Sequence, residues 1–311
     1  MKIVHWNISK ESHPMYAMKK YEDELYENII SLRDDLLIER IQRSENRIFG
    51  STVFSWLFYK CKDADIVHAT FQTVAPAVYF SKPKKFIVTV HDLAPLVYPS
   101  EISDVSIRIQ WLLTPKALEK ADRIIAISEF TKKELIRLLG INKDKISVIH
   151  QGVDHEKYKP MDKKECKEKF GLNPDEKHIL VVSSNVEHKR MDLAKKIFDY
   201  ITCIRDDVKM IKAGYGETLK GEGIISVGWV SEEEMPYLFN AADVYLHTSE
   251  YEGFGLPVLE AMTCGVPVIA NNKASIPEIV GSYGSFAGLD ENNIIQTSEK
   301  ILSLMDNGID I

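Results

Sequence analysis

Two glutamates bracket the segment of this sequence that is best suited to binding a charged ligand. Glu252 and Glu260 lie eight residues apart, on either side of a glycine-bearing turn that leads into a helix with Pro257 in its first turn. Backbone N–H groups and the helix dipole favour a phosphate at such a helix start. Because a carboxylate repels phosphate, each glutamate is expected to face hydroxyl groups instead. The segment therefore predicts a site for a ligand that carries both phosphate and sugar.

A histidine in the first half of the chain is a further candidate. His91 ends the strand expected over Phe86–His91 and is followed by Asp92, which places a polar pair at the carboxyl edge of a parallel sheet. His68, near the end of the preceding expected strand, is a weaker candidate. A purely structural histidine is the alternative interpretation of each.

Short β-branched segments alternate with longer segments of helical periodicity and must position these residues. The pattern predicts parallel strands that are covered on both faces and joined by right-handed crossovers. The expected strands are Lys2–Trp6, Asp65–Ala69, Phe86–His91, Arg123–Ile127, Ile146–Ile149, His178–Ser183, Val208–Lys212, Ile224–Val227, Asp243–His247 and Val266–Ala270. The expected helices include Ile102–Lys120, Ser128–Leu139, Lys189–Arg205, Glu232–Ala241 and Leu256–Cys264. This arrangement favours two doubly wound α/β domains over one closed barrel.

The stretch Gln151–Pro160 separates the two series of strands. It follows a strand, contains the turn residue Gly152, and leads into a segment rich in lysine and glutamate. We therefore expect a first domain over residues 1–152 and a second over residues 153–311. Two such domains are expected to face one another across a cleft at the carboxyl ends of their strands.

Composition excludes several classes of protein. The chain has 311 residues, of which 45% are hydrophobic and 27% charged, as in ordinary globular proteins. A net charge of −7 argues against a nucleic-acid partner. Neither a spanning helix nor a signal peptide is indicated, so a cytoplasmic protein is expected, with contact to a membrane surface left open. Asp63 and Asp65 form a pair reminiscent of metal ligands, but they precede a strand, at the edge of the sheet away from the cleft, and no metal site is implied.

The segment around the two glutamates resembles a known family, the retaining glycosyltransferases of the GT-B fold called "glycosyl transferases group 1". Glu252 and Glu260 match the glutamate-x7-glutamate motif of that family, and the intervening segment Gly253-Phe254-Gly255-Leu256-Pro257 follows its pattern. Blocks at residues 121–131, 148–154, 228–231 and 242–243 agree with the family in the same order along the chain, and the last two fall where the family packs the nucleobase. The resemblance extends over residues 65–305.

The resemblance implies a transferase that moves a hexose from a UDP- or GDP-linked donor to an acceptor hydroxyl of a glycan, lipid or small molecule. It implies that the first domain, residues 1–152, lies on the acceptor side and that the second, residues 153–311, binds the nucleotide sugar. It also implies retention of the anomeric configuration and no metal or other cofactor. Glu260 would hold the ribose diol, Glu252 the donor hydroxyls, Lys189 the diphosphate, and His91 the donor sugar. The remaining donor-binding positions implied by the resemblance are Arg190, Val230, Ser231, Gly253, Phe254, Gly255 and Leu256.

The sequence departs from the family at three places. Ser183 stands where the family has an arginine, for which Arg190 could substitute. Residues 7–14 lack the glycines of the family's first loop, and the chain ends soon after residues 294–305, so that domain closure could be looser or a homo-oligomeric partner could contribute. A non-catalytic sugar-nucleotide-binding protein is therefore the alternative. A dinucleotide-dependent oxidoreductase is disfavoured, because no Gly-x-Gly pair is completed by a third glycine.

Overall fold

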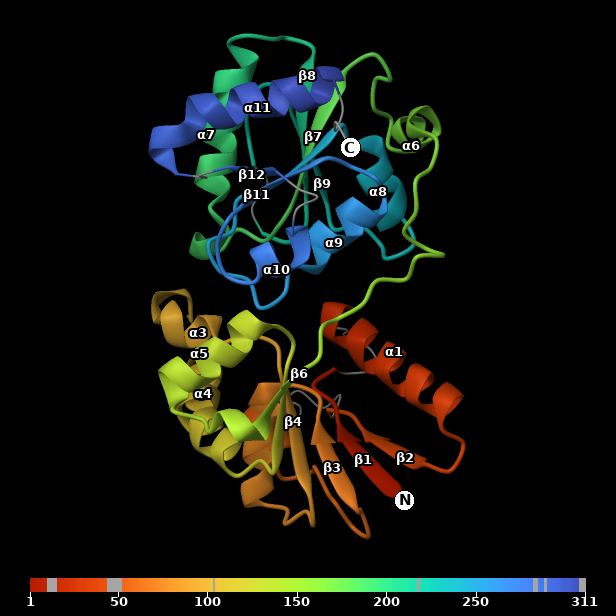
Figure 1. Cartoon of the computed structure of the whole chain (residues 1–311), viewed down its shortest axis with the longest axis vertical. Helices are drawn as coiled ribbons and strands as arrows, with labels where there is room; N and C mark the ends of the chain where they lie inside the picture. The colour runs from red at the N-terminus through yellow and green to blue at the C-terminus, as the bar shows by residue number, and fades with distance from the viewer. Residues whose placement is uncertain are drawn as a thin grey trace. The chain divides into compact units, whose positions relative to one another are not determined.

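The chain folds into two compact units, which the computed structural model describes over residues 1–9, 16–43, 52–102, 104–216, 219–281, 285–287 and 290–307. The N-terminal unit spans Met1–His150 and the C-terminal unit spans Gln151–Ile311 (Figure 1). Each is a parallel α/β layer structure and is described by itself below.

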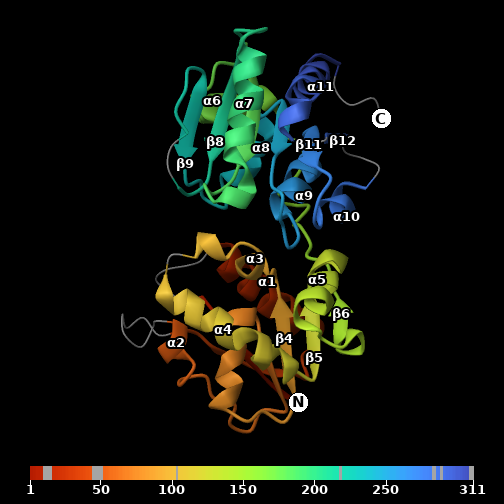
Figure 2. The ribbon, with the colours of Figure 1, turned by 90° about the vertical axis from the view of Figure 1, so that its left-hand side faces the viewer.

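The N-terminal unit is built on a six-stranded parallel sheet in the order β2-β1-β3-β4-β5-β6. Its strands are β1 (Lys2–Trp6), β2 (Leu37–Ile41), β3 (Ile66–Ala69), β4 (Phe86–Val90), β5 (Arg123–Ala126) and β6 (Ile146–Val148). Its helices are α1 (Tyr16–Leu32), α2 (Thr52–Ser55), η1 (Gln72–Tyr79), α3 (Ala94–Val97), η2 (Pro99–Glu101), α4 (Val105–Glu119), α5 (Glu129–Leu139) and η3 (Lys143–Lys145). Helices α1 and α4 cover opposite faces of the sheet (Figures 1 and 2).

The C-terminal unit repeats this architecture with the strand order β12-β11-β10-β7-β8-β9. Its strands are β7 (Lys177–Val182), β8 (Val208–Ala213), β9 (Ile224–Gly228), β10 (Val244–His247), β11 (Val268–Asn271) and β12 (Ser285–Ala287). Its helices are α6 (Lys163–Lys169), η4 (Glu187–Lys189), α7 (Met191–Thr202), α8 (Met235–Ala241), α9 (Leu256–Thr263), α10 (Ile276–Val280), η5 (Glu291–Asn293) and α11 (Ile294–Asn307).

Alternate residues of the central strands supply two separate cores in the C-terminal unit. Ile179 and Val181 face α7 and α11, whereas Leu180 between them packs with the residues of α8 and α9. Both faces of the sheet are therefore apolar, which explains why its strands read as continuous hydrophobic segments. Figure 1 shows the two helix layers on opposite sides of this sheet.

The ten expected strands are all confirmed, with bounds that differ by at most two residues. The expectation of about five strands in each half is wrong by one in each sheet, because the edge strands β2 and β12 were missed. The sequence of β2, Leu-Ile-Glu-Arg-Ile, mixes charged and apolar residues as edge strands often do. The β12 strand has only three residues and no periodicity to detect.

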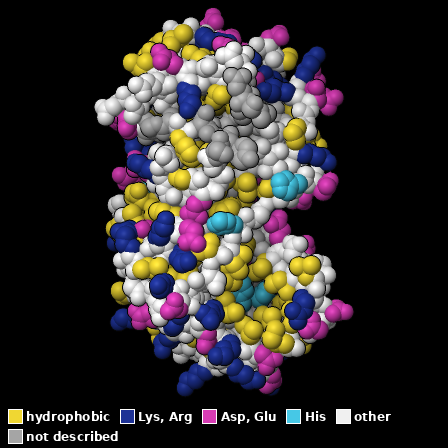
Figure 3. Space-filling view, in the orientation of Figure 1, with side chains coloured by type: hydrophobic (Ala, Val, Ile, Leu, Met, Phe, Trp, Pro, Cys, Tyr) yellow, Lys and Arg dark blue, Asp and Glu magenta, His cyan; other side chains and the backbone are white. Residues whose placement is uncertain are grey.

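Charged side chains of both signs are mixed on one face of each unit. On the face shown in Figure 3, the Lys and Arg side chains of the described residues are interspersed with Asp and Glu.

Asp65 lies directly before β3, at the amino edge of the N-terminal sheet, and its carboxylate accepts from the backbone N–H of Lys2 at 2.9 Å. The expected position of this aspartate at a strand start is thus confirmed.

Candidate functional site

The predicted donor-site residues of the C-terminal unit gather at one edge of its sheet. Lys189 ends η4 after β7, Val230 and Ser231 follow β9, and Glu252 lies in the loop after β10. Because β7 to β10 are parallel, these loops all leave the sheet at its carboxyl edge, where ligands of open α/β sheets bind.

Lys189 and Glu252 form a largely buried ion pair at this edge. Lys189 Nζ donates to Glu252 Oε1 at 2.6 Å, and the two side chains are 21% and 15% exposed. Nε2 of His247 lies 3.2 Å from the same oxygen, although the two atoms are not aligned for a hydrogen bond. Burial alone would raise the pKa of Glu252, but Lys189 and His247 outweigh it and hold that pKa well below its usual range. Glu252 is therefore an ionised acceptor at neutral pH.

The glycine-bearing turn around Glu252 is fixed by hydrogen bonds from two sides. Thr248 Oγ1 donates to the carbonyl of Lys189 at 2.8 Å, and the Glu250 backbone N–H donates to the carbonyl of His188 at 2.8 Å. On the other side, the buried Ser275 hydroxyl lies 2.9 Å from the carbonyl of Glu252. The turn and the lysine are thus positioned as one rigid assembly, which is the condition for a preorganised anion site.

Arg190 is oriented by acidic neighbours beside this pair. It adopts the left-handed conformation with a φ of 51°, and its guanidinium lies 3.0 Å from Glu250 and 3.2 Å from Asp192. Hydrogen bonding to Asp192 is the main cause that raises its pKa. Because these two carboxylates already hold the guanidinium, its expected role as a substitute for the family arginine requires a rearrangement and stays a prediction.

Glu260 lies on the inner face of α9, the helix that the glycine turn leads into. Gly255 precedes α9 with a φ of 108°, and a Cβ atom there would lie 2.7 Å from Ile276 Cδ1. The need for glycine at this position is therefore already set by packing within the protein. Glu260 is 7% exposed. Burial, with the nearby Glu260 carboxylate as the second cause, raises the pKa of Tyr158 and raises the pKa of Cys264 to about 12. The Glu260 carboxylate thus sits in a largely apolar setting with a phenol nearby.

One residue associated with the nucleobase by the family resemblance lies elsewhere. Asp243 precedes β10 at the amino edge, where its carboxylate accepts from the His178 backbone N–H at 2.9 Å and from Lys163 at 2.9 Å. The resemblance associated residues 242–243 with the nucleobase, but Asp243 closes the amino edge of the sheet, opposite to the carboxyl edge that Val230 and Ser231 follow. Val230 and Ser231 do follow the carboxyl end of β9, as expected.

A buried lysine was not anticipated from the sequence. Lys212 is 1% exposed in β8, and its ammonium donates to the carbonyls of Gly214 and Tyr215 at 3.1 and 3.2 Å. Burial lowers its pKa. The signal in the sequence was the position of this lysine directly between the apolar residues Ile211 and Ala213 of the strand. These hydrogen bonds hold the loop after β8 in place. Ser183 lies beside this loop, and its N–H donates to the carbonyl of Ala213 at 3.0 Å.

We expect Gly214→Ala to lower the free energy of unfolding of the C-terminal unit by at least about 2 kcal/mol. Gly214 has a φ of 105°, and a Cβ atom would lie 2.5 Å from the carbonyl oxygen of Ser183. Gly171→Ala is the matched control, because Gly171 has a φ of 64° with no atom near its Cβ position, and only the conformational cost of about 1–2 kcal/mol applies. Urea titrations of both variants test this, and equal losses would contradict the steric argument.

His91 is buried at the carboxyl end of β4 in the N-terminal unit. Its Nε2 lies 3.0 Å from the carbonyl oxygen of Thr70, and its ring meets the rings of Tyr21 and Phe71 at centroid distances of 4.7 and 5.3 Å. Burial lowers the pKa of His91 to about 4. A carbonyl can only accept, so Nε2 carries the hydrogen and Nδ1 is left as an acceptor in a neutral ring.

Two further buried histidines lie beside it on neighbouring strands. His5 and His68 meet edge to face at 5.3 Å, and His68 Nε2 lies 2.8 Å from Thr89 Oγ1. Burial is the main cause that lowers the pKa of His5 to about 4 and that of His68 to about 3. His68 was predicted as the weaker site candidate, and its place within this buried cluster is that of a structural residue.

Acid is expected to destabilise the N-terminal unit through these histidines. Their pKa values in the folded state, about 4, 3 and 4 for His5, His68 and His91, lie below the usual value of about 6.5, so the unfolded chain protonates first. The stability that the folded state gains by keeping these rings neutral is complete above about pH 6.5 and is lost as the pH falls toward 4. A pKa that is lowered by this much changes the free energy of unfolding by up to about 3 kcal/mol for each histidine. Thermal unfolding from pH 8 to 4 measures it. His68→Gln should flatten the curve and His150→Gln, at an exposed position, should not; the reverse would contradict the assignment.

Several expectations extend beyond these observations. His91 belongs to the N-terminal unit, whereas Lys189 and Glu252 belong to the C-terminal unit. That the three residues meet in the expected cleft between the two domains stays a prediction. Residues 10–14 of the glycine-free first loop lie outside the described residues. Within the ranges that the structure describes, no group of three or more His, Cys, Asp or Glu side chains is arranged to hold a metal ion. None of the helices described there combines the length and the apolar character needed to cross a bilayer.

Comparison with known families decides what kind of protein this is. Residues 162–310 match the family described as "Glycosyl transferases group 1", and residues 18–157 match "Glycosyltransferase Family 4". The chain belongs to the glycosyltransferases that these two descriptions cover, one for each half of the chain. The group 1 match includes Lys189, Glu252 and Glu260, and the family 4 match includes His91.

The chain is similar in sequence to several bacterial proteins. It is 30% identical over 241 residues to the O-antigen chain mannosyltransferase B of Escherichia coli, covering 72% of this chain and 62% of the relative. It is 30% identical over 195 residues to an uncharacterized 41.2 kDa protein in the cps region of Klebsiella pneumoniae, covering 61% of this chain and 52% of that protein. The chain thus spans between about half and three fifths of these relatives' lengths.

Solved structures share the fold over nearly the whole chain. Anabaena HepE in complex with UDP and glucose superposes with a TM-score of 0.69 at 19% identity, covering 99% of this chain and 90% of that one. The sucrose-phosphate synthase of Thermosynechococcus elongatus gives a TM-score of 0.75 at 16% identity, covering 98% and 90%. The expected fold class is confirmed: the chain has the GT-B architecture of two Rossmann-like parallel-sheet domains.

Proposed function

We propose that this protein transfers a hexose from a UDP- or GDP-linked donor to an acceptor hydroxyl, with retention of the anomeric configuration and without a metal ion. The observation that carries the proposal is the buried pair of Lys189 and Glu252, fixed beside a glycine turn at the carboxyl edge of the C-terminal sheet. The pair supplies a cation for a diphosphate and an ionised acceptor for sugar hydroxyls within a single rigid assembly. Membership of a glycosyltransferase family supports the same chemistry.

In the proposed reaction, Lys189 acts on the leaving group. An ammonium has three donors, of which one is directed to Glu252, so others are available for phosphate oxygens. As the glycosidic bond breaks, charge grows on the diphosphate and the attraction to Lys189 strengthens, which lowers the barrier. The acceptor oxygen bonds to the anomeric carbon on the face that the diphosphate leaves. Its proton passes to the departing phosphate oxygen, so that no side-chain base is needed and the products are a glycoside and a nucleoside diphosphate.

Other residues are assigned to donor recognition. Glu252 accepts from the hydroxyls of the donor sugar and Glu260 from the ribose diol, while the backbone at Val230 and Ser231 borders the base. The turn Gly253-Phe254-Gly255 and the following Leu256 face the sugar and diphosphate. His91, with its Nδ1 as an acceptor in a neutral ring, contacts a hydroxyl of the donor sugar.

The donor is tested by measuring thermal unfolding with a panel of nucleotide sugars, followed by turnover of those that bind. A ligand at 100 times its dissociation constant should stabilise the fold by about 2.7 kcal/mol. Several relatives are named as mannosyltransferases, so a mannosyl donor is tested first, followed by glucosyl donors. A protein that binds a donor tightly yet never cleaves it, with water or any acceptor, would instead be a non-catalytic sugar-nucleotide-binding protein.

Transfer is expected to proceed unchanged in the presence of a metal chelator. The helix start at Leu256 and the ammonium of Lys189 supply the positive potential that a divalent cation provides in other transferases. Initial rates measured with excess EDTA, and again after Mn²⁺ is added, show the effect of removing and restoring a divalent metal. Activity that is abolished by chelation and restored by Mn²⁺ would overturn the metal-free part of the proposal.

A further inference from the structure

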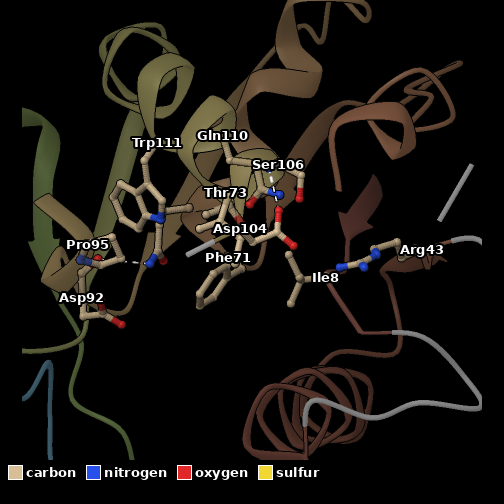
Figure 4. Close-up of a pocket in the computed structure, with 12 residues that line it drawn as sticks. Ile8, Arg43, Phe71, Thr73, Asp92, Pro95, Asp104, Ser106, Gln110 and Trp111 are labelled. Atoms are coloured by element: carbon tan, nitrogen blue, oxygen red, sulfur yellow. Dashed lines mark hydrogen bonds between the residues drawn. The ribbon is translucent and has the colours of Figure 1, made fainter. Parts of the chain in front are cut away.

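A pocket of about 460 Å³ opens within the N-terminal unit, at the carboxyl edge of its sheet. Its size lies in the range of about 300–1,000 Å³ that small-molecule sites occupy. The lining comes from the segments that follow β1, β2, β3 and β4 and from the first half of α4. Figure 4 shows Asp92 and Pro95 toward one end of the pocket and Arg43 toward the other.

The wall formed by α4 holds a buried amide whose nitrogen lacks a partner. Gln110 lines the pocket and is 3% exposed, and among the described residues its Nε2 atom has no hydrogen-bond acceptor. A buried polar group in this state lowers stability unless a ligand or water completes it. The terminal torsion of a glutamine is broad, so a small rotation brings the amide to a ligand. A ligand that accepts a hydrogen bond in this pocket would complete the unpaired nitrogen.

Aromatic rings form the apolar part of the same pocket. Trp111 follows Gln110 on α4 and is 7% exposed, and Phe71 lies between the end of β3 and η1. Both side chains line the pocket (Figure 4). A few polar groups among aromatic walls are typical of sites that hold a small ring with hydroxyl groups.

The charges of the lining disfavour a phosphorylated ligand. Asp92 accepts from the Ala94 backbone N–H at 3.0 Å and Asp104 from the Ser106 backbone N–H at 2.6 Å, so both carboxylates are fixed in place. Arg43 is the one cation among the side chains that line this pocket in the described part of the chain. Two carboxylates against one guanidinium repel a phosphate, whereas carboxylates accept readily from hydroxyl groups.

The pocket is connected directly to His91. Phe71 packs on the His91 ring at a centroid distance of 5.3 Å and an interplanar angle of 31°. Gln72, a residue of the pocket wall, accepts from the His91 backbone N–H at 3.1 Å and donates from Nε2 to the carbonyl of Asp92 at 3.0 Å. A ligand in the pocket would thus lie next to the residue assigned to the donor sugar.

We propose that this pocket holds a neutral hexopyranose, the terminal sugar of a glycan acceptor. The proposal rests on the proposed transferase function for the role of that sugar, and it excludes a phosphorylated acceptor. The pyranose ring packs against Trp111 and Phe71, its hydroxyls donate to Asp92 and Asp104, and a ring or hydroxyl oxygen accepts from the Gln110 amide.

The test compares wild type with Gln110→Leu, which keeps the volume of the side chain and removes its amide. The matched control is Lys116→Gln, on the exposed side of the same helix. Saturation-transfer NMR with neutral methyl hexosides and short oligosaccharides measures sugar binding directly. Initial rates at saturating donor measure the KM for each neutral acceptor and for its 6-phosphate. Thermal unfolding and nucleotide titration serve as readouts of fold and donor site.

Gln110→Leu should raise the dissociation constant and the KM of a neutral acceptor by about 10-fold, the effect of one lost hydrogen bond. Its unfolding temperature should stay equal or rise, because an unpaired polar group has been removed, and its nucleotide affinity should equal that of wild type. Unchanged acceptor binding in Gln110→Leu, or a preference for the 6-phosphate, would overturn the proposal. If no donor is ever cleaved, the transferase function fails, but the NMR arm still decides whether the pocket binds a neutral sugar.

Discussion

Replacing Lys189 with alanine is expected to slow sugar transfer at saturating donor by a factor of about 10²–10³. The ammonium lies 2.6 Å from Glu252 at the edge of the sheet where the diphosphate is proposed to bind. Its attraction to the leaving group is stronger in the transition state than in the ground state, so kcat falls more than binding does. The affinity for the free nucleoside, which carries no phosphate, should be nearly unchanged.

The same substitution has a measurable effect on the fold. Glu252 would remain largely buried without its ammonium partner, so its pKa would rise and the free energy of unfolding would fall by about 1–3 kcal/mol. Assays must therefore be run well below the unfolding temperature of the variant. Lys195→Ala is the matched control, because Lys195 pairs with Asp199 at 2.6 Å on the exposed surface of α7. Equal transfer rates for wild type and Lys189→Ala would remove Lys189 from the proposed mechanism.

Glu260→Ala is expected to produce the opposite kinetic result. We expect the dissociation constants of the nucleoside diphosphate and of the donor sugar to rise together by about 10–100-fold, while the rate at saturating donor changes little. A carboxylate that accepts from both ribose hydroxyls makes charge-assisted hydrogen bonds of about 1.5–3 kcal/mol, and these do not change as the glycosidic bond breaks. Binding that is uniform in the ground and transition states affects KM and not kcat.

A cycle with modified nucleotides separates this role from a structural one. Glu260 also neighbours Tyr158 and Cys264, and its removal could disturb packing. If it binds the diol, the loss of affinity caused by Glu260→Ala should shrink when the nucleotide lacks the 2′ and 3′ hydroxyls. The control Glu299→Ala, at an exposed position of α11, should bind every nucleotide as wild type does. The same loss for ribose and dideoxyribose nucleotides would contradict the assignment.

Most of the fold could be predicted because its central strands are buried on both faces. Ile179, Leu180 and Val181 are apolar in succession, and such a segment has few interpretations in an alternating α/β pattern. The edge strand β2 carried no such signal, since Glu39 and Arg40 lie within it. Edge strands are specified by pairing with a neighbour rather than by their own hydrophobicity.

The candidate site was predicted at the level of loops and not at the level of contacts. Position after a strand was enough to bring Lys189 and Glu252 to one edge, because all strands of the sheet are parallel. Their ion pair joins residues that are 63 positions apart, and no local pattern encodes such a distance. The resemblance associates Asp243 with the nucleobase, but in the structure this residue lies at the opposite edge of the sheet and accepts from Lys163 and from the His178 backbone N–H.

The buried polar groups are the least predictable part of the molecule. Lys212 is held by two carbonyls of the loop that follows β8, and the buried amide nitrogen of Gln110 has no partner within the described part of the chain. Propensity and periodicity place both residues on the surface, since lysine and glutamine are rarely buried. Only the three-dimensional structure shows that they lie beneath a loop and in the wall of a pocket.

The central claim is that this chain breaks the bond between a sugar and a nucleoside diphosphate with retention of configuration. Time-resolved ¹H NMR of the anomeric proton, recorded with the full chain, an α-linked donor and a glycan acceptor, tests it most directly. We predict a new α-linked anomeric signal that grows as the donor signal declines with wild type, and a rate lower by about 10²–10³ with Lys189→Ala. A β-linked product, or a donor signal that stays constant while the protein binds the donor, would contradict it.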